Sequence, residues 1–283
     1  MKFGLMFANT GPFIQPEGLT LLAQKAEEVG VESLWTVEHV VVPTAYASAY
    51  PYSKDGKMPG SEDAPIPDPL VWLGYAAAVT KKINLATGII ILPQRHPFYL
   101  AKEVSTLDQL SGGRVILGVG VGWLEEEFQA LGVPFDRRGP ITDESIEALR
   151  ALWGPGASDH HGERYDWSPV ESNPKPVNGR APIVIGGHSK AAARRAARLG
   201  DGFFPARADK LDECLTELKA ECERIGRDPS EIELTTGSLP TPDEVKRLED
   251  LGVSRFVVPP PGFNPDDLKA GLDKLGNELI AKF

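Results

Sequence analysis

"APIVIGGHSKAAARRAARLGDGFFPA", residues 181–206, is the stretch that decides the fold. Its first part, 181–187, is a short apolar run rich in Ile and Val, which is typical of a β-strand buried on both faces. A serine then precedes the alanine-rich pattern of a helix over 189–200, and a second apolar run, 201–206, predicts the next strand. The stretch therefore predicts two parallel strands joined by a helix.

The same alternation of short apolar runs and helical patterns continues along all 283 residues. Eight buried strands that alternate with helices predict a parallel sheet, and they close most economically into a (β/α)8 TIM barrel forming one domain, residues 1–283. An open doubly wound sheet is the alternative. The predicted strands are 2–7, 33–39, 83–93, 114–123, 181–187, 201–206, 231–237 and 254–260.

Composition and charge narrow the function classes. Hydrophobic residues make up 41% and charged residues 25% of the chain, which is typical of a soluble globular protein. The formal net charge of −10 argues against nucleic acid and anionic membranes as partners, because both favour clustered Lys and Arg. Two cysteines form no C-x-x-C motif, and no segment resembles a secretion signal or a membrane span. We therefore expect a cytoplasmic protein.

Two structureless connections are longer than a linker needs. Residues 40–67 follow the second strand and carry Tyr46, Tyr50 and Tyr52 among prolines. They leave the C-terminal end of a strand, where barrel enzymes hold their active sites, so we predict a lid that faces the substrate. Residues 155–180 enter the N-terminal end of the fifth strand, and a functional and a structural role both stay open.

The fourth strand, "RVILGVGVGW" (114–123), has glycine at every second position from Gly118 to Gly122. The Rossmann pattern G-x-G-x-x-G does not fit, because Trp123 or Glu125 stands where the third glycine is required. Strict alternation places the three glycines on one side of the strand. They allow either close packing of a helix against the barrel wall or room for a flat ring at the C-terminal mouth.

Three turns at strand ends differ in how well their backbone could bind an anion. "GGHS" (186–189) joins a strand to a helix, whose free backbone N–H groups and dipole attract negative charge. An ordinary serine N-cap is the alternative explanation of this turn. "TTGS" (235–238) is a second candidate, whereas the three prolines of "VPPPG" (258–262) lack N–H groups.

His39 ends the second predicted strand in "TVEH" (36–39). A lone histidine is more often structural, but the C-terminal end of a barrel strand favours a functional role. Histidine is also the natural proton donor or acceptor near neutral pH. The other histidines show neither an H-x-H pair nor helical spacing with a carboxylate, so no metal site is predicted.

Several motifs in register resemble the bacterial luciferase-like flavin and deazaflavin enzymes. They are "RHPFYLAKEVSTLDQLSGGRVILGVGVGWLEEEFQALGVPFDRR" (95–138), "HGERYDW" (161–167), "PIVIGGHS" (182–189) and "RLGDGFF" (198–204). The resemblance covers essentially the whole chain. It implies a (β/α)8 barrel that binds FMN or its 5-deaza relative, coenzyme F420, at the C-terminal mouth.

The resemblance also implies catalytic roles. His39 matches the proposed base of deazaflavin-dependent alcohol and sugar-phosphate dehydrogenases. Glu38 matches an acidic residue near the cofactor, placed to polarise His39 or to contact the ring. Some of those enzymes carry a glutamate, acting as an acid, at the position of Trp123. An indole cannot serve as that acid, so sugar-phosphate oxidation is disfavoured.

The cofactor-binding residues follow from the same resemblance. "ATGIIILP" (86–93) resembles a strand bulge with a non-prolyl cis peptide behind the ring, here between Gly88 and Ile89, and a plain buried strand is the alternative. The residues implied at the cofactor are Glu38 and His39, then Thr87, Gly88 and Ile89, then Gly120, Val121, Gly122 and Trp123, and at the phosphate Gly186, Gly187, His188 and Ser189.

The sequence thus predicts a cytoplasmic, F420-dependent oxidoreductase that moves a hydride between ring carbon C5 and an unidentified small organic substrate. The preference for F420 over FMN rests on the resemblance of "GVGVGWLEEEF" (118–128) to that branch. The alternatives are an FMN-dependent two-component monooxygenase and a cofactor carrier or sensor without turnover. Trp123 and the tyrosines of 40–67 predict an apolar or aromatic pocket, and the resemblance implies a homodimer.

Overall fold

The computed structural model describes residues 1–60, 63–237 and 241–283, and within them parallel strands close into a barrel. In the order β3-β2-β1-β11-β10-β9-β8-β5, the first and last strands also pair with each other, and β4 continues β3. The (β/α)8 TIM barrel is confirmed and the open sheet is wrong. The strands are β1 (Lys2–Leu5), β2 (Ser33–Thr36), β3 (Asn84–Thr87), β4 (Ile90–Ile91), β5 (Val115–Gly120), β8 (Ile183–Gly186), β9 (Gly202–Phe204), β10 (Glu233–Gly237) and β11 (Val253–Val258).

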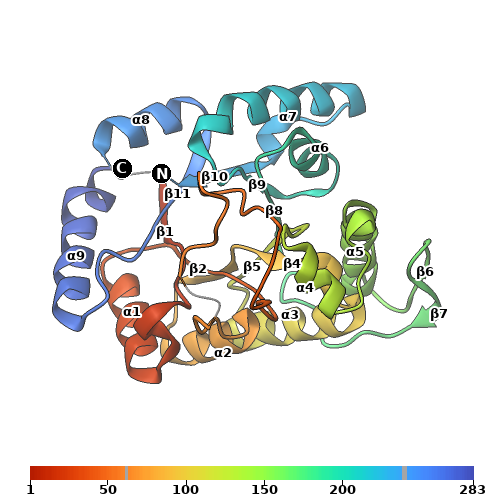
Figure 1. Cartoon of the computed structure of the whole chain (residues 1–283), viewed down its shortest axis with the longest axis horizontal. Helices are drawn as coiled ribbons and strands as arrows, with labels where there is room; N and C mark the ends of the chain where they lie inside the picture. Colours follow the sequence, from red (N-terminus) through yellow and green to blue (C-terminus); the bar gives the residue numbers. More distant parts are fainter. Residues whose placement is uncertain (61–62, 238–240) are drawn as a thin grey trace.

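Helices surround the strands (Figure 1). They are α1 (Pro16–Glu28), α2 (Pro69–Val79), α3 (Pro97–Ser111), the short α4 (Glu125–Ala130), α5 (Arg138–Trp153), α6 (Lys190–Leu199), α7 (Leu211–Ile225), α8 (Pro242–Asp250) and α9 (Pro265–Glu278). Local chemistry sets several helix ends, as at α2, where the Asp68 carboxylate accepts the Leu70 and Val71 amides at 2.9 and 3.0 Å. In the described part of the chain, every helix falls short of what a membrane crossing requires.

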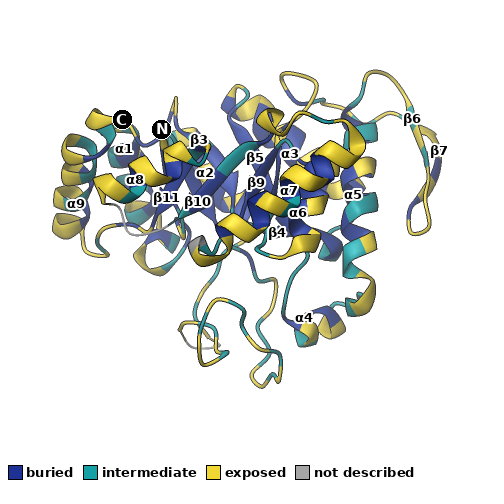
Figure 2. Ribbon diagram, turned by 90° about the horizontal axis from the view of Figure 1, so that it is seen from above, coloured by how far each residue is buried: buried dark blue, intermediate teal, exposed yellow. Residues whose placement is uncertain are grey.

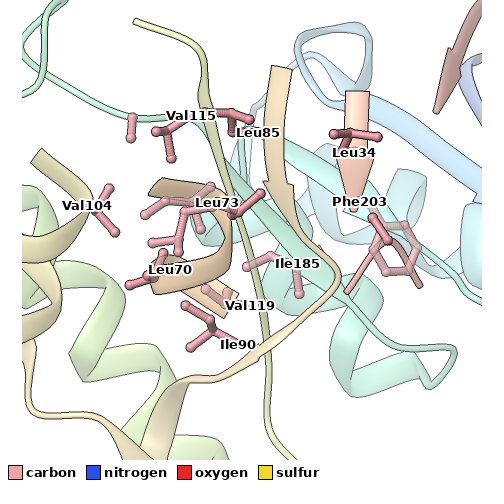
Figure 3. Close-up of a cluster of buried hydrophobic side chains, with 14 of the residues drawn as sticks. Leu34, Leu70, Leu73, Leu85, Ile90, Val104, Val115, Val119, Ile185 and Phe203 are labelled. Atoms are coloured by element: carbon pink, nitrogen blue, oxygen red, sulfur yellow. The ribbon is translucent and has the colours of Figure 1, made fainter. Parts of the chain in front are cut away.

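Alternate strand residues supply two apolar cores. The larger core lies between strands and helices, and in Figure 3 Leu34 and Leu85 of the barrel gather with Leu70 and Leu73 of α2. The smaller core lies inside the barrel, where it joins strands that are distant around the ring: Trp35, Ala86, Ile116, Val184, Phe204 and Val257. Because successive side chains serve opposite cores, strands such as β5 and β8 are buried and apolar over most of their length.

Residues 155–180 contain regular structure, so the expectation of a structureless connection is wrong there. They form an antiparallel hairpin of β6 (Ser158–His161) and β7 (Asp166–Val170), which stands out beside α5 in Figure 1. Trp167 of β7 lies 4.9 Å from Phe98 of α3, between ring centroids, and 4.7 Å from His160. The contact with Phe98 holds the hairpin against α3, the contact with His160 joins its two strands, and both favour the structural role.

Gly118 and Gly120 leave room for the neighbouring strand. A Cβ atom on Gly118 would lie 1.8 Å from the carbonyl oxygen of Thr87 at the end of β3. One on Gly120 would lie 2.7 Å from the side chain of Ile89. The Thr87 hydroxyl also donates to the Gly118 carbonyl at 2.7 Å. Both glycines are therefore explained by close packing, although against a strand rather than a helix.

Gly122 lies beyond the end of β5, so the predicted alternation does not reach it. Its φ of +80° lies in the left-handed region, which glycine adopts readily and other residues disfavour. A Cβ atom there would approach the Phe128 ring of α4 to 2.6 Å and Ile91 to 2.8 Å. The residue thus gives the chain a sharp turn directly beneath α4.

The packing at Gly118 predicts a large cost for one added methyl group. Gly118→Ala should lower the free energy of unfolding by about 3 kcal/mol, because the methyl group meets rigid backbone. Gly74→Ala is the matched control, since nothing lies within 4 Å of a Cβ at that position in α2. It should stabilise the protein by up to about 1 kcal/mol. Urea unfolding followed by circular dichroism measures both, and equal midpoints would contradict the packing described here.

Candidate active site

The predicted site residues gather at one side of the barrel mouth. They follow the C-terminal ends of β2, β3, β5 and β8, and each of these strands pairs with the next in that order. At the same end α4 lies among long loops that project beyond the ring of helices (Figure 2). The C-terminal ends of neighbouring parallel strands are where barrel enzymes assemble their chemistry.

His39 is paired with a carboxylate that the sequence analysis did not assign. Its Nδ1 lies 2.9 Å from Oε2 of Glu127 in α4. The Glu127 side chain is fully buried, and its other oxygen accepts the backbone amides of Val40 and Val41 at 2.7 and 3.3 Å. The imidazole, with 9% of its side chain exposed, is therefore held at the edge of the mouth.

The contacts of Glu38 are with Ile91 and Arg95 rather than with His39, and its predicted role, to polarise His39 or to contact the ring, stays a prediction. Its carboxylate accepts the Ile91 amide at 2.6 Å and the Nε and Nη2 groups of Arg95, the former at 2.9 Å. Arg95 also donates to Asp68 at 2.6 Å. Burial raises the pKa of the Glu38 carboxyl, although the Arg95 guanidinium and the Ile91 amide favour its charged form. Glu38 thus holds β4 in place from below the mouth.

The strand bulge has the form that the resemblance implied. The peptide bond between Gly88 and Ile89 is cis, and it separates β3 from β4. The Ile89 side chain extends over β5 and β8, because Cβ atoms on Gly120 and Gly186 would meet it at 2.7 and 2.6 Å. Two strand-end glycines therefore flank an apolar ledge, formed by Ile89, at the mouth.

The turn after β8 combines an N-cap with a candidate anion site. The Ser189 hydroxyl accepts the Ala192 amide at 3.2 Å, and the Gly187 amide donates to the Phe204 carbonyl at 3.1 Å. These two groups serve the local fold, as the N-cap alternative requires. Nδ1 of His188 is buried without a hydrogen-bond partner among the described residues. Of "TTGS", Ser238 lies outside those residues.

Aromatic side chains cover the mouth. Trp123 makes edge contacts with His39, Tyr46 and Tyr50, with ring centroids 5.8, 5.7 and 5.2 Å apart. Tyr52 continues this series of ring contacts: its centroid lies 5.2 Å from that of Tyr50 and 5.1 Å from that of His188. Burial, with a smaller effect of Tyr52, raises the pKa of Tyr50 to about 12, so its hydroxyl stays protonated at neutral pH.

The loop 40–67 is tied to α4 by neighbouring glutamates. Oε1 of Glu126 accepts the amides of Ala47 and Ser48 at 2.6 and 3.3 Å. The backbone amide of Glu125 donates to the Ser48 hydroxyl at 3.1 Å. The loop thus contacts α4 and Trp123 at the mouth, and its role as a lid stays a prediction; its residues 61 and 62 lie outside the described part of the chain.

Glu127 was not predicted from the sequence because it belongs to a run of three glutamates, a pattern that usually indicates a solvent-exposed face. A signal was nevertheless present. Leu124, Glu127 and Phe128 have the i, i+3, i+4 spacing of one buried helix face, and all three are fully buried. An acid in that pattern needs a partner inside the protein. Within the described ranges, no cluster of three His, Cys, Asp or Glu residues is arranged to hold a metal ion.

A family model described as luciferase-like monooxygenase matches residues 1–247. The chain belongs to this family. An uncharacterized protein of Mycobacterium tuberculosis is 33% identical over 281 residues, which is 99% of each chain. An FMNH2-dependent dimethylsulfone monooxygenase of Pseudomonas putida is 34% identical over 131 residues, 45% of this chain and 36% of that one. The predicted family resemblance is confirmed.

Solved structures of the family fold include both chemistries. The monooxygenase RslO1 from Streptomyces bottropensis has a TM-score of 0.78 at 23% identity and covers 100% of this chain and 99% of its own. An F420-dependent secondary alcohol dehydrogenase, in complex with an F420–acetone adduct, has a TM-score of 0.77 at 18% identity, covering 99% and 98%. At these identities the likeness shows the shared fold alone.

The contacts of Glu126 predict how firmly the loop 40–67 is held. Glu126→Ala removes an acceptor of two amides, a change of about 1 kcal/mol, and should speed trypsin cleavage at Lys54 and Lys57 about fivefold. Glu125→Ala is the matched control, because only the backbone of Glu125 bonds to Ser48. Timed digestion with mass spectrometry measures both rates. Equal cleavage of the two variants would show that this carboxylate does not hold the loop.

Proposed function

We propose that this luciferase-like protein is a cytoplasmic F420-dependent oxidoreductase, which transfers a hydride between the deazaflavin C5 and a small organic substrate. The observation that carries the proposal is the pair of His39 and Glu127 at the same mouth as the Ile89 ledge. A positioned histidine can exchange a proton with a hydroxyl or carbonyl group, and an apolar ledge can support a flat ring.

The residues at the mouth fit a flavin-type cofactor. Ile89 offers an apolar surface at the end of the barrel interior, next to the strand that leads to Trp123. His188 has a buried, unpartnered Nδ1 in the turn after β8, and the positive charge of Arg207 acts on it. Burial and that charge lower the pKa of His188. The turn therefore retains polar groups toward which a cofactor phosphate could bind.

Each of these residues has a role in the proposed reaction. The bound deazaflavin supplies the hydride acceptor or donor. Ile89 supports the ring, while Glu38 and Arg95 hold β4, the strand that follows Ile89. His39 takes a proton from a substrate hydroxyl, or returns one to a carbonyl. Trp123 and the tyrosines of the loop 40–67 exclude water and form an aromatic wall for the substrate.

The second candidate is an FMN-dependent two-component monooxygenase. It is favoured by the Pseudomonas putida relative, whose name states FMNH2 dependence, and by the monooxygenase name of RslO1. The ledge and the turn after β8 suit either ring system, because an apolar surface and a phosphate site would serve FMN and F420 alike. The cofactor is therefore the first property to measure.

Titration with both cofactors tests the proposed function. We expect F420, oxidised or reduced, to bind the apoprotein with micromolar or lower Kd and to quench tryptophan fluorescence, while FMN binds much more weakly. Trp123→Phe should remove most of the quenching but leave the affinity, measured by calorimetry, nearly unchanged. A preference for FMN would replace the proposal by the monooxygenase alternative, and binding of neither would overturn both.

Substitution of His39 tests its role in turnover. In a screen of alcohols and carbonyl compounds with F420, His39→Gln should lower the rate by about 100-fold or more, because a general acid–base group contributes about that much. The Kd for F420 should change less than about twofold. His161→Gln is the control, since that side chain lies on the distant hairpin. Full activity of the His39 variant would show that His39 is not the proton-exchanging group, and no turnover by the wild type with any substrate would favour a carrier or sensor.

A further inference from the structure

Glu127 has three hydrogen-bond partners within the protein. Oε1 accepts two backbone amides, from Val40 and Val41, and Oε2 faces Nδ1 of His39 at 2.9 Å. The side chain is almost completely buried, and it lies on the buried face of α4 with Leu124 and Phe128. A buried acid with three protein partners is fixed in position.

The chemistry of these partners determines which histidine nitrogen carries the proton. Backbone N–H groups can only donate, and an ionised carboxylate can only accept. In the neutral imidazole one nitrogen donates and the other accepts. Since Nδ1 faces an acceptor, it must carry the hydrogen, which leaves the lone pair on Nε2, the nitrogen that does not face Glu127.

We propose that Glu127 is the positioning residue that fixes His39 in the Nδ1–H tautomer and so makes Nε2 the proton acceptor. The inference rests on the proposed function for the use of that proton, but the tautomer itself is a property of the protein alone. Glu127 also binds the first two residues of the loop 40–67. The same carboxylate therefore couples the start of that loop to the orientation of the imidazole.

A single substitution should reverse the tautomer. In Glu127→Gln, the one amide oxygen is taken by the Val40 and Val41 N–H groups, since leaving both buried donors unpaired is unfavourable. The amide NH2 group then faces Nδ1 of His39. Because NH2 can only donate, Nδ1 becomes the acceptor and the hydrogen moves to Nε2. In this variant the Val40 and Val41 amides keep their acceptor, while the imidazole loses the Nδ1–H tautomer.

The test is a two-bond 1H–15N correlation spectrum of the apoprotein labelled with 15N-histidine, with His39 assigned from the His39→Gln spectrum. The pH is raised until the neutral imidazole is observed. In the wild type, Nδ1 should have the shift of a protonated nitrogen and Nε2 that of an unprotonated one. In Glu127→Gln the two shifts should exchange. Glu125→Gln is the control and should match the wild type, because the Glu125 carboxylate contacts Gln129.

Each outcome bears on the proposal. An Nε2–H or averaged tautomer in the wild type would overturn it, even if Glu127→Gln does not fold. An unchanged spectrum in a folded Glu127→Gln variant would also overturn it and reduce Glu127 to an anchor of the loop. Since no cofactor is present in these spectra, a failure here leaves the cofactor titration unaffected. Equally, a failure to bind F420 leaves the tautomer assignment intact.

Discussion

The side chain of Ile89 takes space at the barrel mouth, and the neighbouring strands are shaped around it. Gly120 of β5 and Gly186 of β8 leave no room for a side chain of their own, since a Cβ on either would lie within 2.7 Å of Ile89. Two residues earlier in β5, Gly118 likewise leaves space for the carbonyl oxygen of Thr87. The repeated glycines of β5 are thus the consequence of a bulge in β3, and the ledge depends on them.

Two buried acids then hold the segments around the ledge, and their partners give them different functions. Glu38 is paired with Arg95, whose charge is permanent, and accepts the Ile91 amide, so it fixes the strand after the bulge. Glu127 is paired with His39, and histidine is the side chain best suited to exchange a proton in catalysis. The first pair provides a rigid support, and the second provides a proton-exchanging group at the same mouth.

The sequence predicted the fold well because most barrel strands supply buried apolar side chains, which leaves recognisable apolar runs such as β8. It also placed His39 and Ile89 at the mouth. The local apolar pattern predicted the strand end at His39, and the family resemblance implied the bulge at Ile89. The partner of His39 could not be predicted by the same means. Glu127 lies 88 positions away, and only the packing of α4 across the mouth brings the two side chains together. The regular hairpin within 155–180 was missed because its strands are short and polar.

The central claim is that the Ile89 ledge and His39 face a flavin-type ring from the same mouth. A crystal structure of the protein with coenzyme F420 tests it most directly. The account predicts electron density for the ring against Ile89, beside His39, with Tyr50 and Tyr52 displaced from their present contacts with Trp123 and His188. Density for the ring outside the mouth, or a ring separated from Ile89 by another side chain, would contradict it.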